Sequence, residues 1–193
     1  MPDRPLQAAL PREMYVEPGT WLAERELALF GQWFCLGRTD DLGLEATSRV
    51  ATVDVAGESV LVMRDAAGAL HAAYNVCRHR GSQIRPTAGA ADAAACDLSA
   101  LRCPYHSWTY GLDGRLLRAP HTELTGVDLE RFRLAPVGVD TWGGFVFVHL
   151  TPEGSTPLAE AVARADVTLK ASLKGKRKYA GWDDAFMAAL IAG

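Results

Sequence analysis

Hydrophobic and polar positions alternate over short stretches of this chain, with the period of two that is typical of half-buried β-strands. The apolar residues Ala51, Val53 and Val55, for example, are separated by single polar residues. Comparable alternating or apolar runs predict strands at 33–38, 48–55, 59–64, 70–74, 108–110 and 145–150. Turn signals rich in Asp and Gly separate some of them, at 65–68 and 113–114. The pattern therefore predicts a mainly β fold built from short antiparallel hairpins.

Helical signals lie toward the two ends of the chain. Residues 1–17 are interrupted by prolines and are predicted to be extended. A helix is predicted over residues 19–31, where an apolar stripe follows Thr20, a suitable N-cap. Near the other end, Thr156 and Pro157 predict the start of a short helix, because proline is favoured at the first helical position.

These patterns divide the chain into three parts. We predict an N-terminal lead and helix at 1–32, a central domain at 33–152 and a C-terminal extension at 153–193. Within the extension, five of the nine residues from Lys170 to Lys178 are basic. We interpret this run as a solvated tail, although a site for an acidic partner or a phosphate would also be basic.

Composition narrows the class of protein. The chain has 193 residues, 49% of them hydrophobic, and a net charge of −3, which indicates a globular protein. The part before Lys170 has a net charge of −6, which argues against binding to nucleic acid. No stretch approaches the ~18 apolar residues that span a membrane. The first residues lack the apolar run of a secretory signal, so we expect a cytoplasmic protein.

Two short motifs carry the candidate chemistry. Cys77 and His79 form the pattern C-x-H. Cys103 and His106 form the pattern C-x-x-H. Each motif offers one thiolate and one imidazole at a spacing that lets both reach one metal centre. Two thiolates on one iron and two imidazoles on the other are the ligands of a Rieske [2Fe–2S] cluster, so we predict that these four residues bind one.

The ligand types determine the charge of such a cluster. Two ferric ions, two sulfides and two thiolates sum to zero, because neutral imidazoles add nothing. Replacing two thiolates by imidazole therefore raises the reduction potential, to about −150 to +300 mV. A structural zinc site is the alternative, since zinc also takes two Cys and two His. Against zinc, the cysteines are not paired as C-x-x-C, and no helix with H-x3-5-H follows.

The segments CRHRGS (77–82) and CPYHSWTYGLDGRL (103–116) closely resemble the Rieske domain of ring-hydroxylating oxygenases, in their large (alpha) subunit. Segments 10–17 and 142–148 are also similar, so the resemblance covers roughly residues 10–163. It implies an all-β Rieske fold of three small antiparallel sheets. It also implies that the outer edges of the two imidazoles are where electrons enter and leave.

Four further residues are expected to surround the cluster: Arg80, Gly81, Tyr105 and Trp108. Gly81 would permit a tight loop whose backbone amides point at the sulfurs. The aromatic rings of Tyr105 and Trp108 would shield the cluster, although ordinary core packing would also explain them.

The resembled family has a second, mononuclear Fe(II) held by two His and a carboxylate in a later domain. The remaining histidines here, His71, His121 and His149, are scattered, and none follows His149. We therefore predict no catalytic residue and no mononuclear iron within this chain. The family implies a ferredoxin or flavin reductase as the electron donor, and a homo-oligomer, a trimer in the family.

Three functions stay open from the sequence. The first is the electron-transfer domain of an oxygenase alpha subunit that acts on aromatic compounds or quaternary amines. The second is a self-contained Rieske ferredoxin, and the third is a structural zinc module. The helix and lead-in before residue 33 favour the first, since carriers are usually little more than the cluster domain.

The two other cysteines are not assigned to the cluster. Cys35 lies in an apolar run and is predicted to be a small residue of a buried strand. Cys96 ends an alanine-rich stretch, 86–96, that we interpret as an inserted surface loop. A disulfide between these two cysteines is not expected in a reducing cytosol.

Overall fold

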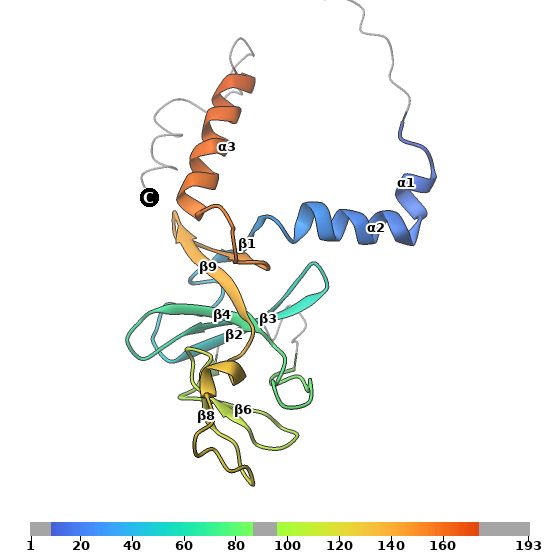
Figure 1. Cartoon of the computed structure of the whole chain (residues 1–193). Coiled ribbons are helices and arrows are strands. Elements are labelled where there is room, and N and C mark those ends of the chain that lie inside the picture. The colour runs from blue at the N-terminus through green and yellow to red at the C-terminus, as the bar shows by residue number, and fades with distance from the viewer. Residues whose placement is uncertain (1–8, 87–95, 174–193) are drawn as a thin grey trace, which may run out of the picture.

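The computed structural model describes residues 9–86 and 96–173, which form two antiparallel sheets with helices at both ends (Figure 1). The larger sheet has the strand order β1-β10-β9-β4-β3-β2-β5. Its strands are β1 (Trp33–Arg38), β2 (Arg49–Val55), β3 (Glu58–Arg64), β4 (Leu70–Tyr74), β5 (Cys96–Asp97), β9 (Pro136–Trp142) and β10 (Phe145–His149). The smaller sheet, in the order β6-β7-β8, consists of β6 (Leu101–Arg102), β7 (Thr109–Tyr110) and β8 (Leu116–Arg118). The mainly β fold is therefore confirmed.

The larger sheet has two halves. Strands β1, β10 and β9 form one half, and β4, β3, β2 and β5 form the other. A short antiparallel pairing joins them, with Ala72 opposite Val137 and Ala73 opposite Pro136. If the two halves are counted separately, they and the smaller sheet are the three small antiparallel sheets that the resemblance implied, and two of these are continuous with each other.

Strand β3 is buried on both faces. Val60 and Val62 belong to a core cluster lined by strands of both halves of the larger sheet. Leu61 and Met63 point the opposite way, into a second cluster shared with the smaller sheet. Because successive side chains of a strand face opposite sides, a strand between two cores reads as a continuous apolar run. This explains why 59–64 shows little alternation.

The N-terminal lead is helical earlier than predicted. Helix α1 (Glu13–Val16) occupies part of the stretch expected to be extended, and α2 (Pro18–Glu24) continues into a π-helical turn, η1 (Arg25–Leu29). Thr20 lies inside α2 and does not cap it, because Pro18 already occupies the first helical turn. Proline is pre-organised for that position, since its fixed φ suits a helix and its missing N–H needs no partner there.

Together α1, α2 and η1 form an arm that projects from the sheets (Figure 1). Its apolar stripe is therefore exposed, with Trp21 50% and Leu22 52% accessible to solvent. Arg25 anchors the base of the arm. Its guanidinium lies 3.7 Å from the carboxylate of Glu58 in β3, and 5.1 Å from the ring centre of Phe30.

The C-terminal helix α3 (Leu158–Leu173) is longer than the short helix predicted, and it begins directly after Pro157. The apolar and basic residues after position 173 lie outside the described residues. Within the described part of the chain, no helix is long and apolar enough to cross a membrane.

Besides α1 and β5, four elements were not predicted: β6, β8, β9 and the 3-10 helix η2 (Leu129–Phe132). Strand β9 contains Pro136, Gly138 and Asp140, residues that are depleted in strands. Its pairing with β10 on one side and β4 on the other stabilises it nonetheless.

The prediction for Cys35 was wrong, because its side chain is exposed. In the larger sheet β1 is an edge strand, and the register with β10 shifts between Cys35 and Gly37. Such a bulge adds a residue and redirects the neighbouring side chains. The backbone of Cys96 belongs to β5, where it pairs with Val50, and not to a loop as predicted.

Candidate metal centre

Two loops hold the candidate ligands, and they have the same backbone structure. In the first loop, Gly81 N donates to Cys77 O at 3.0 Å, and Cys77 N donates to Ser82 O at 2.8 Å. In the second, Ser107 N donates to Cys103 O at 3.0 Å, and Cys103 N donates to the carbonyl of the next residue, Trp108, at 2.8 Å. The backbone of each cysteine is thus hydrogen-bonded to the backbone of the fourth and fifth residues after it. The loops are structurally equivalent although their histidines stand two and three residues after the cysteines.

The fourth residue after each cysteine adopts a left-handed backbone conformation. Gly81 has φ of +72°, as the prediction of a tight loop required. Ser107 has φ of +60°, which is uncommon for a residue other than glycine. Two side chains support it, because Arg102 donates to Ser107 Oγ at 2.8 Å and the hydroxyl of Thr109 donates to Ser107 O at 3.1 Å.

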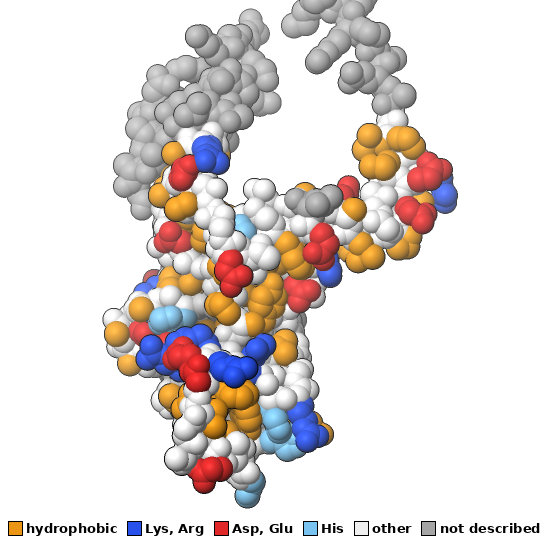
Figure 2. Space-filling view, viewed as in Figure 1, with side chains coloured by type: hydrophobic (Ala, Val, Ile, Leu, Met, Phe, Trp, Pro, Cys, Tyr) orange, Lys and Arg blue, Asp and Glu red, His pale blue; other side chains and the backbone are white. Residues whose placement is uncertain are grey.

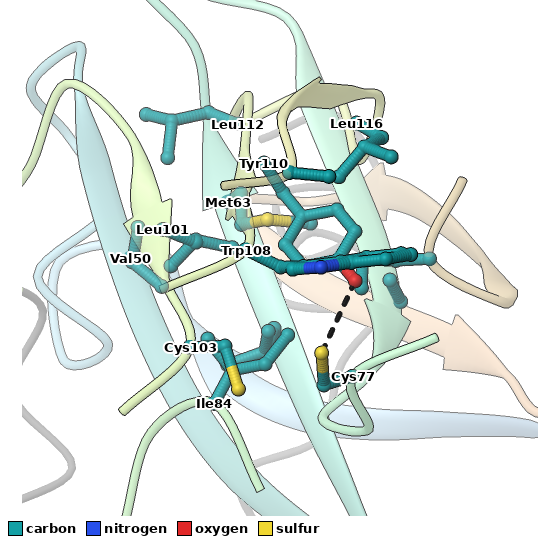
Figure 3. Close-up of a cluster of buried hydrophobic side chains, with 14 residues drawn as sticks. Val50, Met63, Cys77, Ile84, Leu101, Cys103, Trp108, Tyr110, Leu112 and Leu116 are labelled. Atoms are coloured by element: carbon teal, nitrogen blue, oxygen red, sulfur yellow. Dashed lines mark hydrogen bonds between the residues drawn. The ribbon is translucent and has the colours of Figure 1, made fainter. Parts of the chain in front are cut away.

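The two thiols lie inside the core cluster next to the smaller sheet. Cys77 and Cys103 are each only 2% exposed, and they share the cluster with Trp108 and Tyr110 (Figure 3). The hydroxyl of Tyr110 lies 3.2 Å from Cys77 Sγ and accepts the backbone N–H of Arg78 at 3.1 Å. The Tyr110 oxygen thus accepts a hydrogen bond from the amide of Arg78, and the hydrogen of the same hydroxyl can be donated to the sulfur of Cys77.

The surroundings of the thiols favour different protonation states. Burial raises the pKa of the Cys77 thiol, although Tyr110 and a backbone amide oppose this. Burial would also raise the pKa of Cys103, but the amides of Tyr105 and His106 donate toward its sulfur and the pKa is lowered. Burial raises the pKa of Tyr110, and its contact with Cys77 adds to the effect, so its hydroxyl remains a donor. Backbone amides thus oppose the effect of burial at both thiols.

The two imidazoles lie on the outer side of the thiols. The ring centres of His79 and His106 are 4.7 Å apart, with an angle of 70° between the planes. Trp108 stacks on His79 at 4.7 Å and 9°, and is itself buried. Burial lowers the pKa of His79, and the nearby His106 and Arg80 lower it further. The lowered pKa of His79 favours its neutral form, the state in which an imidazole binds a metal.

The two aromatic residues expected to shield the site differ in their positions. Trp108 is 6% exposed and lies between His79 and Phe132, whose ring centre is 5.8 Å away. Tyr105 is 61% exposed, and its ring centre lies 3.8 Å from that of His106. Trp108 therefore fixes an imidazole and closes the core, whereas Tyr105 covers His106 from the solvent side.

These donors fit a two-metal cluster better than one ion. Two buried sulfurs and two outer imidazoles form separate pairs. Among the residues that the structure describes, no three His, Cys, Asp or Glu side chains converge on a single metal ion. A tetrahedral zinc site needs four such ligands around one point.

The remaining histidines have other surroundings. His71 in β4 lies 2.9 Å from an oxygen of Asp65. His149 in β10 is 4% exposed and meets Trp33 edge to face, with ring centres 5.4 Å apart. His121 lies in a turn, with φ of +59°. The three histidines thus lie in separate strand and turn positions.

The sequence reasoning missed Tyr110 as part of the site. It is two residues after Trp108, so both side chains face the same side of a strand and enter the same core. That spacing was the available signal, but the approach of Tyr110 to Cys77 depends on how the two loops pack.

A sequence model described as the Rieske [2Fe-2S] domain matches residues 32–133, just over half of the chain. The oxygenase subunit of glycine betaine monooxygenase from Chromohalobacter salexigens is 36% identical over 145 residues, covering 75% of this chain and 31% of that protein. The oxygenase subunit of carnitine monooxygenase from Escherichia coli K12 is 30% identical over 148 residues, covering 76% of this chain and 37% of that protein. The chain thus spans about a third of the length of the curated relatives it matches.

Solved structures agree with the sequence matches. The apo form of the quaternary ammonium Rieske monooxygenase CntA has a TM-score of 0.66 at 30% identity, covering 79% of this chain and 42% of CntA. The paired Cys/His loops occur on the fold that this family shares, and the resemblance in the two motifs is confirmed. The chain therefore belongs to the Rieske [2Fe–2S] domain family, and within it this chain is similar to the Rieske domains of oxygenase subunits.

Proposed function

We propose that the two thiols and two imidazoles of the paired loops hold the [2Fe–2S] cluster and that the chain transfers single electrons within an oxygenase. The ligands would be Cys77, Cys103, His79 and His106. The observation that supports this most is the equivalence of the two loops, which turn both thiols into one core and bring the imidazole centres within 4.7 Å. The bound cluster supplies one-electron transfer.

The residues around the ligands have distinct roles in this proposal. The hydroxyl of Tyr110 and the loop amides donate to the sulfurs and stabilise negative charge on them. Stacking on Trp108 fixes the orientation of the His79 ring. The left-handed residues Gly81 and Ser107 close the two loops, so that the cysteine and the histidine of one loop can bind the same cluster.

The electron path extends beyond this chain. We propose that a ferredoxin or flavin reductase donates the electron and that a mononuclear iron in a neighbouring subunit of a homo-oligomer, such as a trimer, accepts it. A related CntA structure is described as revealing inter-subunit electron transfer, which supports this route. For the whole enzyme we propose a quaternary amine substrate, because relatives acting on glycine betaine and carnitine are 30–36% identical to this chain. We also propose a cytoplasmic location for the protein.

Metal analysis and spectroscopy test the ligand assignment. The purified chain should contain two irons and two sulfides, and its reduced form should give the electron paramagnetic resonance spectrum of a histidine-ligated cluster. Cys77→Ser and Cys103→Ser should each lose the cluster. Cys35→Ser removes an exposed thiol outside the site and should keep it. Stoichiometric zinc, or a spectrum of four-cysteine ligation, would show the assignment to be wrong.

A further inference from the structure

A cavity of about 270 Å³ lies where the N-terminal arm joins β1 and where α3 begins. Its walls are residues 31–33, His149 at the end of β10, and Thr156, Ala161 and Arg164 before and within α3. In Figure 2 the surface of the molecule is hollowed between α3 and the arm. None of the lining residues belongs to the two Cys/His loops, so this cavity is separate from the candidate metal centre.

His149 is the buried polar residue of the cavity wall. It is 4% exposed, and its Nδ1 has no hydrogen-bond partner among the residues that the structure describes. Trp33 contacts the ring from one side, and Gly138 in β9 is so close that a Cβ added there would lie 3.2 Å from His149 Cβ. The ring is therefore held in place by packing. Buried polar atoms without a partner are rare in folded proteins, and a bound group commonly explains them.

The polar groups around the cavity favour a negatively charged occupant. Helix α3 begins two residues after Thr156, so the positive end of its dipole lies beside the cavity. Arg164 lines the same cavity and forms an ion pair with Glu160, one turn earlier in α3. The imidazole of His149 carries at least one N–H donor in either protonation state. Among the described residues, no Asp or Glu lines the cavity.

The remaining walls indicate which kind of anion fits. The indole N–H of Trp33 already donates to Thr156 O at 2.8 Å, so the ring offers apolar surface to the cavity. The methyl group of Ala161 adds to that surface. A guanidinium group matches the planar geometry of a carboxylate. A fully polar anion would leave the apolar walls without a complementary partner, whereas a carboxylate with an apolar body would use both kinds of wall.

We propose that this cavity binds a small molecule that has one carboxylate and an apolar body. His149 and Arg164 contact the carboxylate near the start of α3, and the apolar body lies against Trp33 and Ala161. The site goes beyond the proposed function and does not depend on it, because none of its residues is a proposed ligand of the cluster.

Benzoate is the probe, and the full chain is titrated with it in calorimetry and in nuclear magnetic resonance. The wild type should bind benzoate with a Kd of about 1 mM or below, and benzamide, which lacks the charge, at least about tenfold more weakly. The amide signals of Gln32 and Ala161 should shift. Arg164→Met should weaken the binding of benzoate at least about fivefold, because it removes a charge-assisted contact. Arg12→Met removes the same charge from the exposed residue before α1 and should leave the affinity unchanged.

His149→Phe keeps a ring in the buried position and should also weaken the binding of benzoate. If this variant does not fold, Arg164→Met still decides, since Arg164 is on the exposed face of a helix. No binding of benzoate, or equal affinity in Arg164→Met and Arg12→Met, would overturn the site. Equal affinity for benzoate and benzamide would mean that no carboxylate is recognised. Signal shifts confined to the smaller sheet would place the benzoate elsewhere. Displacement of benzoate by hexaglutamate would mean that the cavity receives an acidic segment of a protein, and the proposal would be wrong.

Discussion

The hydroxyl of Tyr110 approaches a candidate sulfur, at 3.2 Å from Cys77 Sγ. A hydrogen bond to sulfur stabilises the reduced cluster more than the oxidised one, because reduction adds negative charge. On the proposed ligation, Tyr110→Phe should keep the cluster and lower its reduction potential. A net hydrogen bond of about 1 kcal/mol corresponds to a fall of about 40 mV for one electron. Potentiometric titration measures it.

Tyr105→Phe is the matched control, because it removes the same hydroxyl from a ring that is 61% exposed. The potential of this variant should equal that of the wild type. An unchanged potential in Tyr110→Phe would show that its hydroxyl does not act on the cluster.

Asp65 connects the turn between β3 and β4 to β4 itself. Its carboxylate lies 2.9 Å from His71 Nε2 and accepts the amide of Ala69 at 2.9 Å. The hydrogen bond with His71 is the largest cause of the lowered pKa of Asp65, and the amide of Ala69 adds to it. A carboxyl with a lowered pKa in the folded state stabilises the protein above its ordinary pKa. That contribution is lost as the pH falls through the folded-state value.

Asp65→Asn should therefore reduce the free energy of unfolding at pH 7 but have little effect below the folded-state pKa of Asp65. Urea unfolding at several pH values measures both. Asp41→Asn, in an exposed loop, is the control. A destabilisation by Asp65→Asn that does not diminish as the pH falls below the ordinary range of an aspartate would contradict this account.

At the scale of elements, the bulge of the edge strand β1 depends on one glycine. Gly37 has φ of +134°, and a Cβ added there would meet no atom within 4 Å. The cost of a side chain at this position is therefore backbone strain and not a clash. Gly37→Ala should lower the free energy of unfolding by about 1–3 kcal/mol.

Gly19→Ala is the matched test of that explanation. Gly19 also has open space around its Cβ position, but it lies in helix α2 without a positive φ. Alanine favours a helix over glycine, so this variant should be no less stable than the wild type. Equal losses in denaturant unfolding for the two variants would rule out the conformational cause.

For the whole molecule, the two core clusters differ in what holds them together. The cluster with Val60 and Val62 is enclosed by strands of the larger sheet. The cluster with Cys77 and Cys103 lies between strands of the larger sheet on one side and the two loops and the short strands of the smaller sheet on the other. A metal cluster that connects the two loops would therefore contribute most to the stability of the second core cluster.

Removing iron with a chelator should consequently loosen one part of the molecule first. Hydrogen exchange at the amides of β6, β7 and β8 should become at least about tenfold faster, while β3 and β10 keep most of their protection. Mass spectrometry of exchanged peptides measures both regions in one sample. Equal loss of protection throughout the described sheets would mean that the two clusters unfold as one unit.

The 193 residues should accept electrons without oxygenating a substrate. Two of the five histidines are proposed ligands, and the other three lie in different surroundings. A non-haem iron that activates oxygen needs two His and a carboxylate on one face. The assay combines this chain with a reductase, NADH, oxygen and a set of quaternary amines and aromatic compounds. Hydroxylated product formed in step with NADH consumption would reveal a second iron site.

Local patterns in the sequence were sufficient for much of this protein. Alternating and apolar runs identified strands such as 48–55 and 70–74, and the spacing of Cys and His in two motifs indicated the cluster and the family. These features depend on residues a few positions apart, so they can be read directly from the chain.

Only the tertiary structure decided how distant segments meet. It brought Tyr110 to Cys77, aligned Arg102 with Arg118 across β7, and made the two loops equivalent. It also placed Cys35 on an exposed edge strand. Strand register and edge position arise from pairings between segments far apart in the sequence. The apolar pattern of one segment cannot specify which neighbour it will have, and for that reason the sequence left these features open.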